Sequence, residues 1–396
     1  MESGLNSLKN THLLKRLFLY AIFIFFAIER WLVVYGYQAP ILLIFGLLIF
    51  YILFKSGFSF PYNFKLDAYV FLLFVFLAFQ IFLISLKYGI SFSSIYVHHY
   101  VPFFIGFYLL RISRIDINFA RKVLKFFLII VSTLYVFEFL FDAFISDSIR
   151  VSFMEAQRNR GHLGDGINPT FFNYPFIGNF FRPRGPLILS SPSGQFFLFL
   201  CLFLFATSSQ LNRRYLYILI AGLLVFISGS KSAYFVFLFS LFLILLIKYK
   251  NLFFVLIPLF VVIFFLLFDF LFDSDRAAFY WHSFYTNSLR VFLLNFVNLS
   301  PFDIILGGSS LSSGGEISFL HDIFRYGIIN YSFFWFIFFL FYLHLRKLTH
   351  FSLLILVSFI SSFFHYPVML QSPASFIYGF IISYVLLFKL SILSNR

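Results

Sequence analysis

The chain has 396 residues, of which 61% are hydrophobic, 24% aromatic and only 11% charged, and its formal net charge is +14. Soluble domains carry about 25% charged residues, so this composition excludes a cytosolic enzyme, a secreted disulfide scaffold and a nucleic-acid-binding domain. Apolar runs of about 20 residues, separated by short polar joints, instead indicate an all-α polytopic integral membrane protein.

The apolar runs predict about 12 transmembrane helices, each long enough to cross a bilayer with some tilt. In chain order they cover residues 14–34, 38–54, 67–86, 96–110, 122–143, 186–207, 213–229, 232–248, 251–271, 323–343, 350–365 and 374–390. The first run follows a basic start without a small-residue cleavage site, so we read it as a span rather than a signal peptide. We expect residues 1–396 to form a single transmembrane domain.

The distribution of charge predicts the orientation of these spans. With the N-terminus in the cytoplasm, the alternation leaves 18 basic and three acidic residues inside, and 11 basic and 12 acidic residues outside. Basic residues concentrate on the cytoplasmic side of membranes. The sequence therefore predicts a multi-pass protein with both termini cytoplasmic.

Two external loops are long, and we place them at residues 144–185 and 272–322. The cations in these loops, or just beyond them, are all arginines: Arg150, Arg158, Arg160, Arg182, Arg184, Arg276, Arg290 and Arg325. A guanidinium group holds phosphate oxygens bidentately, whereas lysine is a point charge. This selective use predicts an external site for a phosphate-bearing ligand. A competing interpretation is that the arginines face anionic lipid headgroups.

The sequence lacks the common motifs for nucleotide binding, zinc binding and serine-hydrolase catalysis. There is no glycine-rich nucleotide loop, no His-x-x-x-His zinc pair and no Gly-x-Ser-x-Gly elbow. The one cysteine, Cys201, lies within an apolar run. We therefore expect neither a metal nor a cofactor. Two acids near the outer ends of spans, Glu29 and Glu138, are expected to have structural roles.

Three stretches carry a more specific signal. They are Arg182-Pro183-Arg184-Gly185-Pro186 with Ser191-Pro192-Ser193-Gly194; Ser228-Gly229-Ser230-Lys231-Ser232; and Gly307-Gly308, Glu316, Leu320-His321-Asp322 and Tyr326-Gly327-Ile328-Ile329. In this order, on one side of a twelve-span topology, they resemble the O-antigen polymerase and ligase (Wzy/WaaL) superfamily. The closer resemblance is to the Wzy-type polymerases.

This resemblance implies a metal-independent glycosyltransferase with a GT-C-like fold in the bacterial inner membrane, with its active site facing the periplasm. Its donor and acceptor would both be undecaprenyl-diphosphate-linked oligosaccharides, of O-antigen or capsule type. The resemblance also implies a separate co-polymerase that sets chain length. Beyond these partners we expect contact with membrane lipid and none with nucleic acid.

The leaving group of such a reaction is a lipid diphosphate, whose negative charge needs fixed cations when no metal is present. The positions we favour for this task are Arg184 or Arg182, together with Arg290 and Lys231. Arg276 is a second choice. Arg158 and Arg160 lie among polar residues, where they contact glycan or are simply solvated.

The acceptor is a sugar hydroxyl, which attacks best when a base removes its proton. Glu316 and His321 are the candidates, and the sequence does not decide between them. The ligase pattern places a glycine about ten residues after its histidine, whereas Gly327 follows His321 by six residues and Asn330 stands at the next expected glycine. We therefore favour a polymerase over a ligase. A flippase for the same lipid-linked sugars and a scaffold for polysaccharide assembly are two further hypotheses.

Overall fold

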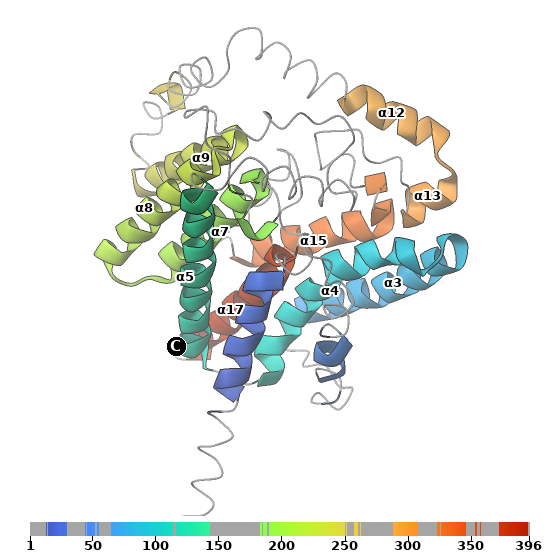
Figure 1. Cartoon of the computed structure of the whole chain (residues 1–396), viewed down its shortest axis with the longest axis horizontal. Coiled ribbons are helices and arrows are strands. Elements are labelled where there is room, and N and C mark those ends of the chain that lie inside the picture. Colours follow the sequence, from blue (N-terminus) through green and yellow to red (C-terminus); the bar gives the residue numbers. More distant parts are fainter. Residues whose placement is uncertain are drawn as a thin grey trace, which may run out of the picture. The chain divides into compact units, whose positions relative to one another are not determined.

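The computed structural model describes residues 13, 15–29, 44, 46–51, 54, 65–113, 116–142, 183, 185–187, 190–249, 251, 257–259, 262, 288–307, 323–324, 326–345, 353–354, 357 and 372–394. Over these residues the chain is all-helical, with no strand (Figure 1). Contacts divide the chain into two compact units. One comprises Met1–Pro61, His99–Gly229 and Leu370–Arg396, and the other comprises Tyr62–His98 and Ser230–Met369.

The first unit contains most of the long helices that follow residue 99. They are the main part of α4 (Ile90–Ser113), α5 (Ile117–Asp142), the short 3-10 turn η2 (Gly185–Leu187), α7 (Ser190–Thr207), α8 (Leu211–Ser228) and α17 (Ala374–Ser394). Helical residues 15–29 belong to the same unit.

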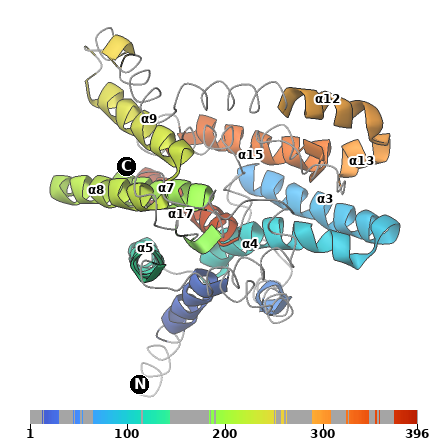
Figure 2. The ribbon, with the colours of Figure 1, turned by 45° about the horizontal axis from the view of Figure 1, so that its top comes forward.

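The second unit contains α3 (Lys65–Tyr88), α9 (Lys231–Lys248), α12 (Ser288–Asn298), α13 (Pro301–Leu306) and α15 (Ile328–Leu345). Figure 2 shows α3 beside α15, and the two helices run antiparallel. The Tyr69 ring centre lies 5.9 Å from that of Phe336, and the Phe76 ring centre lies 6.1 Å from that of Phe333. The C-terminal end of α3 is therefore at the same end of the pair as the start of α15.

Three described helices are long and apolar enough to cross a membrane: Asp67–Tyr88, Ile117–Leu140 and Leu211–Ser228. Four shorter apolar helices cover Pro192–Thr207, Ser232–Lys248, Ile328–Leu343 and Ala374–Leu387. All seven coincide with spans that the sequence predicts, and α4 covers an eighth. The predicted spans at 251–271 and 350–365 lie largely outside the described residues, so the total of 12 stays a prediction.

The long helices carry large apolar side chains on their outer faces. Leu219 of α8 is 70% exposed, Ile129 of α5 is 62% exposed and Phe82 of α3 is 59% exposed. A helix that is apolar all round is suited to a membrane interior rather than to water. The described residues are thus compatible with a membrane-embedded helical protein.

Close packing of α4 against α17 holds the core of the first unit together. A Cβ atom on Gly106 would overlap the carbonyl oxygen of Phe376, and one on Gly379 would overlap that of Phe103. Small residues at such crossings let two helix backbones approach each other, as is common between membrane helices. The ring of Phe26 stacks on that of Phe376 with centroids 3.9 Å apart, which adds residues 15–29 to this core.

Candidate functional site

Two of the nine predicted site residues belong to the described part of the chain. Arg290 is the third residue of α12 and its side chain is exposed. Lys231 is the first residue of α9. The other seven lie outside the described residues: Glu316, His321, Arg182, Arg184, Arg276, Arg158 and Arg160. The described residues near them show which contacts fix the three motif-bearing stretches named in the sequence analysis.

The first stretch is fixed against α5 next to Arg184. Gly185 has φ +63°, in the left-handed region that favours glycine, and a Cβ atom there would lie 2.7 Å from the Tyr135 ring. The N–H of Gly185 donates a hydrogen bond to Glu138 Oε2 over 3.0 Å. The N–H of Leu187 donates to Ser193 Oγ over 3.2 Å. Residues Gly185–Leu187 form η2, so the α-helix of the predicted span 186–207 begins at Ser190.

The second stretch is a two-residue connection between the end of α8 and the start of α9. Gly229 adopts a left-handed conformation, and its N–H donates to the carbonyl of Phe226 over 3.0 Å. Ser230 then caps α9, because its Oγ accepts the N–H of Ala233 over 3.4 Å. These two caps end one helix and begin the next at Lys231, so the cation occupies the first turn of α9.

In the third stretch, the end of α13 meets the start of α15. Gly327 has φ +79°, and a Cβ atom there would lie 2.5 Å from the carbonyl oxygen of Ile305 and 2.8 Å from the nitrogen of Gly307. Gly327 therefore lies directly against the end of α13 and Gly307. The predicted span 323–343 begins as a continuous helix only at Ile328, because the positive φ of Gly327 interrupts it.

A buried side chain from α3 joins these two ends. The Gln80 amide nitrogen donates hydrogen bonds to the carbonyl oxygen of Leu306 and, over 2.6 Å, to that of Tyr326. Gln80 is 2% exposed. A buried carbonyl group without a hydrogen-bond donor destabilises the fold. The Gln80 amide supplies that donor and thereby links Leu306 and Tyr326 to α3.

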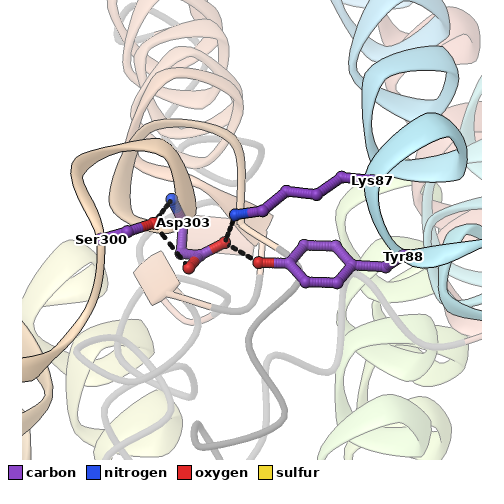
Figure 3. Close-up of polar contacts among 4 residues, drawn as sticks. All are labelled: Lys87, Tyr88, Ser300 and Asp303. Atoms are coloured by element: carbon purple, nitrogen blue, oxygen red, sulfur yellow. Dashed lines mark hydrogen bonds and ion pairs between the residues drawn. The ribbon is translucent and has the colours of Figure 1, made fainter.

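An ion pair anchors α13 to the end of α3 beside this junction (Figure 3). Lys87 Nζ lies 3.1 Å from Asp303 Oδ1, and the Tyr88 hydroxyl donates to the same oxygen. Ser300 Oγ donates to Asp303 Oδ2 over 2.7 Å and also accepts the Asp303 N–H over 3.2 Å. The ammonium group of Lys87 lies 4.3 Å from the centre of the Phe302 ring.

These contacts determine the ionisation of Asp303. Partial burial by itself raises the pKa of its carboxyl group, but hydrogen bonds from Tyr88, Ser300 and Lys87, together with the charge of Lys87, more than offset it. The net pKa of Asp303 therefore lies below its ordinary value. Asp303 therefore links α13 to the end of α3 as a carboxylate near neutral pH.

An aromatic contact connects α12, which carries Arg290, with the chain that follows His321. The Phe292 ring centre lies 5.0 Å from that of Phe324, which is fully buried. Arg290 precedes Phe292 by two residues, and His321 precedes Phe324 by three. The described contact thus joins the helix of Arg290 to Phe324, the third residue after His321 in the sequence.

The roles of Gln80, Lys87 and Asp303 were not predicted from the sequence. Two of these residues, Gln80 and Asp303, left a signal in the sequence. Gln80 is an amide within a strongly apolar run, where a polar side chain needs a partner. Ser300-Pro301-Phe302-Asp303 has a capping serine, a proline at the first helical position and an acid in the first turn, which together indicate a helix start. Neither signal indicates which distant residue is the partner.

Comparisons with protein-family models, with curated proteins and with solved structures found no match. The class that the structure itself supports is that of an all-helical protein whose apolar helices are compatible with a membrane.

Proposed function

We propose that this protein is a polymerase of lipid-linked polysaccharide repeat units, of O-antigen or capsule type. It is a Wzy-type, metal-independent glycosyltransferase with about 12 spans and a GT-C-like fold, and it works in the bacterial inner membrane. Both termini are cytoplasmic and the active site faces the periplasm. Its donor and acceptor are undecaprenyl-diphosphate-linked oligosaccharides, and a co-polymerase regulates chain length.

In the proposed reaction, a hydroxyl of the non-reducing sugar on the incoming repeat unit attacks the anomeric carbon of the growing glycan. A new glycosidic C–O bond forms, and the bond from the anomeric carbon to the lipid diphosphate breaks. The hydroxyl proton passes to Glu316 or His321, acting as general base. The diphosphate leaves with the bonding electrons, and Arg184 and Arg290 stabilise its charge.

The remaining predicted residues bind substrate in this proposal. Arg182, Lys231 and Arg276 contact the diphosphates, since cations fixed in a partly dehydrated site attract such groups strongly. Arg158 and Arg160 contact the glycan. The acceptor repeat unit retains its own lipid diphosphate, which is why more cations are assigned than a single leaving group requires.

The observation that carries the proposal is the contact between Phe292 and Phe324. It attaches the helix of an exposed arginine to the chain that holds the candidate bases. Two residues after Phe324, the carbonyl oxygen of Tyr326 is bound by Gln80, and Gly327 packs against the end of α13. A cation for the leaving group and a base for the nucleophile must act on one substrate, and a shared rigid junction is suited to that requirement.

A gel of surface glycan from a strain lacking the protein tests the function. A single core-plus-one-unit band is the expected result, because ligation survives when polymerisation is lost. Absence of glycan on the core, with polymer accumulating on the lipid carrier, would identify a ligase instead. Absence without that polymer would identify a flippase.

Arg290 variants in the complemented strain test the chemistry. Arg290→Ala should abolish long glycan at an unchanged protein level. Arg290→Lys keeps the charge but loses the bidentate geometry, so it should be impaired if both guanidinium nitrogens contact the diphosphate. Wild-type polymer length in Arg290→Ala would remove Arg290 from the mechanism.

A further inference from the structure

Four cationic side chains gather on α5 and α8 of the first unit. Arg121, Lys122 and Lys125 belong to the first turns of α5, and Arg213 belongs to the first turn of α8. The two helices contact each other. The charges of Arg121, Lys122 and Arg213 all act on Lys125, so the four side chains form one electrostatic cluster, which we call the α5–α8 cluster.

No ion pair neutralises this cluster within the part of the chain that the structure describes. Asp116, five residues before Arg121, acts with Arg121 on Tyr384 but forms no ion pair with the four side chains. In the described part, no hydrogen bond or ion pair joins any of the four side chains to another residue, and Arg121 Nε is buried without a partner. The next residue on α8 differs, because Arg214 Nε donates to the Ser208 carbonyl over 2.8 Å. Like charges repel one another, and a bound anion would relieve the repulsion that Arg121, Lys122 and Arg213 exert on Lys125.

Exposed apolar side chains begin directly beside the α5–α8 cluster. Ile129, one helical turn beyond Lys125, is 62% exposed. On α8, Leu216 and Leu219 follow Arg213 by three and six residues and are also exposed. On these two helices a cationic surface continues into an apolar one. Such a surface is complementary to an amphiphile with an anionic headgroup rather than to a small soluble anion.

We propose that the α5–α8 cluster binds the phosphate group of an anionic phospholipid, with its acyl chains along Ile129, Leu216 and Leu219. Basic pockets between membrane helices bind such headgroups on the cytoplasmic side. The positive-inside prediction assigns the cluster to that side, opposite the proposed site of polymerisation. The lipid site therefore does not depend on the proposed function.

Lipid titration of the purified full-length protein in a neutral detergent, read by native mass spectrometry, tests this site. The probes are phosphatidylglycerol and phosphatidylcholine with identical acyl chains. We expect the phosphatidylglycerol Kd to be at least about tenfold lower, and Lys125→Gln or Arg213→Gln to raise it about fivefold each. Arg213 is exposed, so its replacement leaves helix packing intact.

Lys248→Gln is the matched control, since it removes one exposed cation from the end of α9 without touching the cluster. It should leave the phosphatidylglycerol Kd unchanged. Equal affinity for the two lipids, or an equal loss with Lys248→Gln, would overturn the proposal in favour of general interfacial attraction. Displacement of the lipid by an equal concentration of inorganic phosphate would show a site for soluble phosphate instead.

Discussion

The ring of Phe292 in α12 lies 5.0 Å from the ring of Phe324, which is buried just before α15. This pair joins two segments that are 32 positions apart in the chain. It is the contact through which the helix of Arg290 meets the segment that follows His321.

Phe292→Ala should shorten the polymer and lower stability by about 1–2 kcal/mol, because an aromatic pair contributes roughly 0.5–1.5 kcal/mol beyond the area it buries. Leu293→Ala is the control, since Leu293 lies on the same helix and is 55% exposed. Glycan length and the thermal midpoint of the detergent-purified protein are the measurements. Equal effects of the two substitutions would show that the contact with Phe324 has no special role.

Glu138 is predicted to position the chain next to Arg184 through its hydrogen bond from the Gly185 N–H. Glu138→Gln keeps an oxygen acceptor and should retain long glycan. Glu138→Leu leaves the N–H without its partner, which costs about 1–3 kcal/mol when the group is buried, and should shorten the polymer. Glycan length at matched protein level is the readout. Similar loss in both variants would instead assign the role to the negative charge.

Gly327→Ala should destabilise the protein by about 2–4 kcal/mol, because it combines a strained positive φ with overlap of the α13 backbone. Two other glycines separate these causes. Gly89 has φ +88° but open space around its Cβ position, and Gly46 has neither constraint. The thermal midpoint should therefore fall most for Gly327→Ala, less for Gly89→Ala and least for Gly46→Ala. Equal changes for Gly327 and Gly89 would show that the contact with α13 is unimportant.

The ion pair of Asp303 predicts a defined pH dependence. Its folded-state pKa is depressed, so its contribution to stability is fully present above the unfolded pKa of about 3.9. That contribution is lost as pH falls through the lower folded-state pKa. The free energy of unfolding of the wild type should exceed that of Asp303→Asn by about 1 kcal/mol near pH 7. This difference in stability should shrink below about pH 4.

Urea unfolding in detergent at a series of pH values measures that difference. Asp116→Asn removes an exposed carboxyl group and serves as the control for nonspecific charge effects. A difference between wild type and Asp303→Asn that stays constant down to pH 3 would contradict the role assigned to the carboxylate.

Much of the local structure could be predicted from the sequence because it depends on local causes. Hydropathy placed eight apolar helices that the structure contains, since a run of apolar residues has no stable alternative to an internally hydrogen-bonded helix in a membrane. The helix boundaries at Gly185 and Gly229 could also be predicted, because glycine favours positions where the chain turns. The interruption at Gly327, after which α15 begins at Ile328, was not predicted, since hydropathy does not sense a φ angle.

The partners of the polar residues were decided only by the tertiary structure. Gln80 bonds to a carbonyl 246 positions away, and Lys87 pairs with Asp303 across 216 positions. No local pattern specifies such a pairing, because it depends on which helices pack together and in what register. Composition and periodicity thus determined that this is an apolar helical chain. The packing of α3, α13 and α15 determined which residues pair with one another before and after the stretch that contains Glu316 and His321.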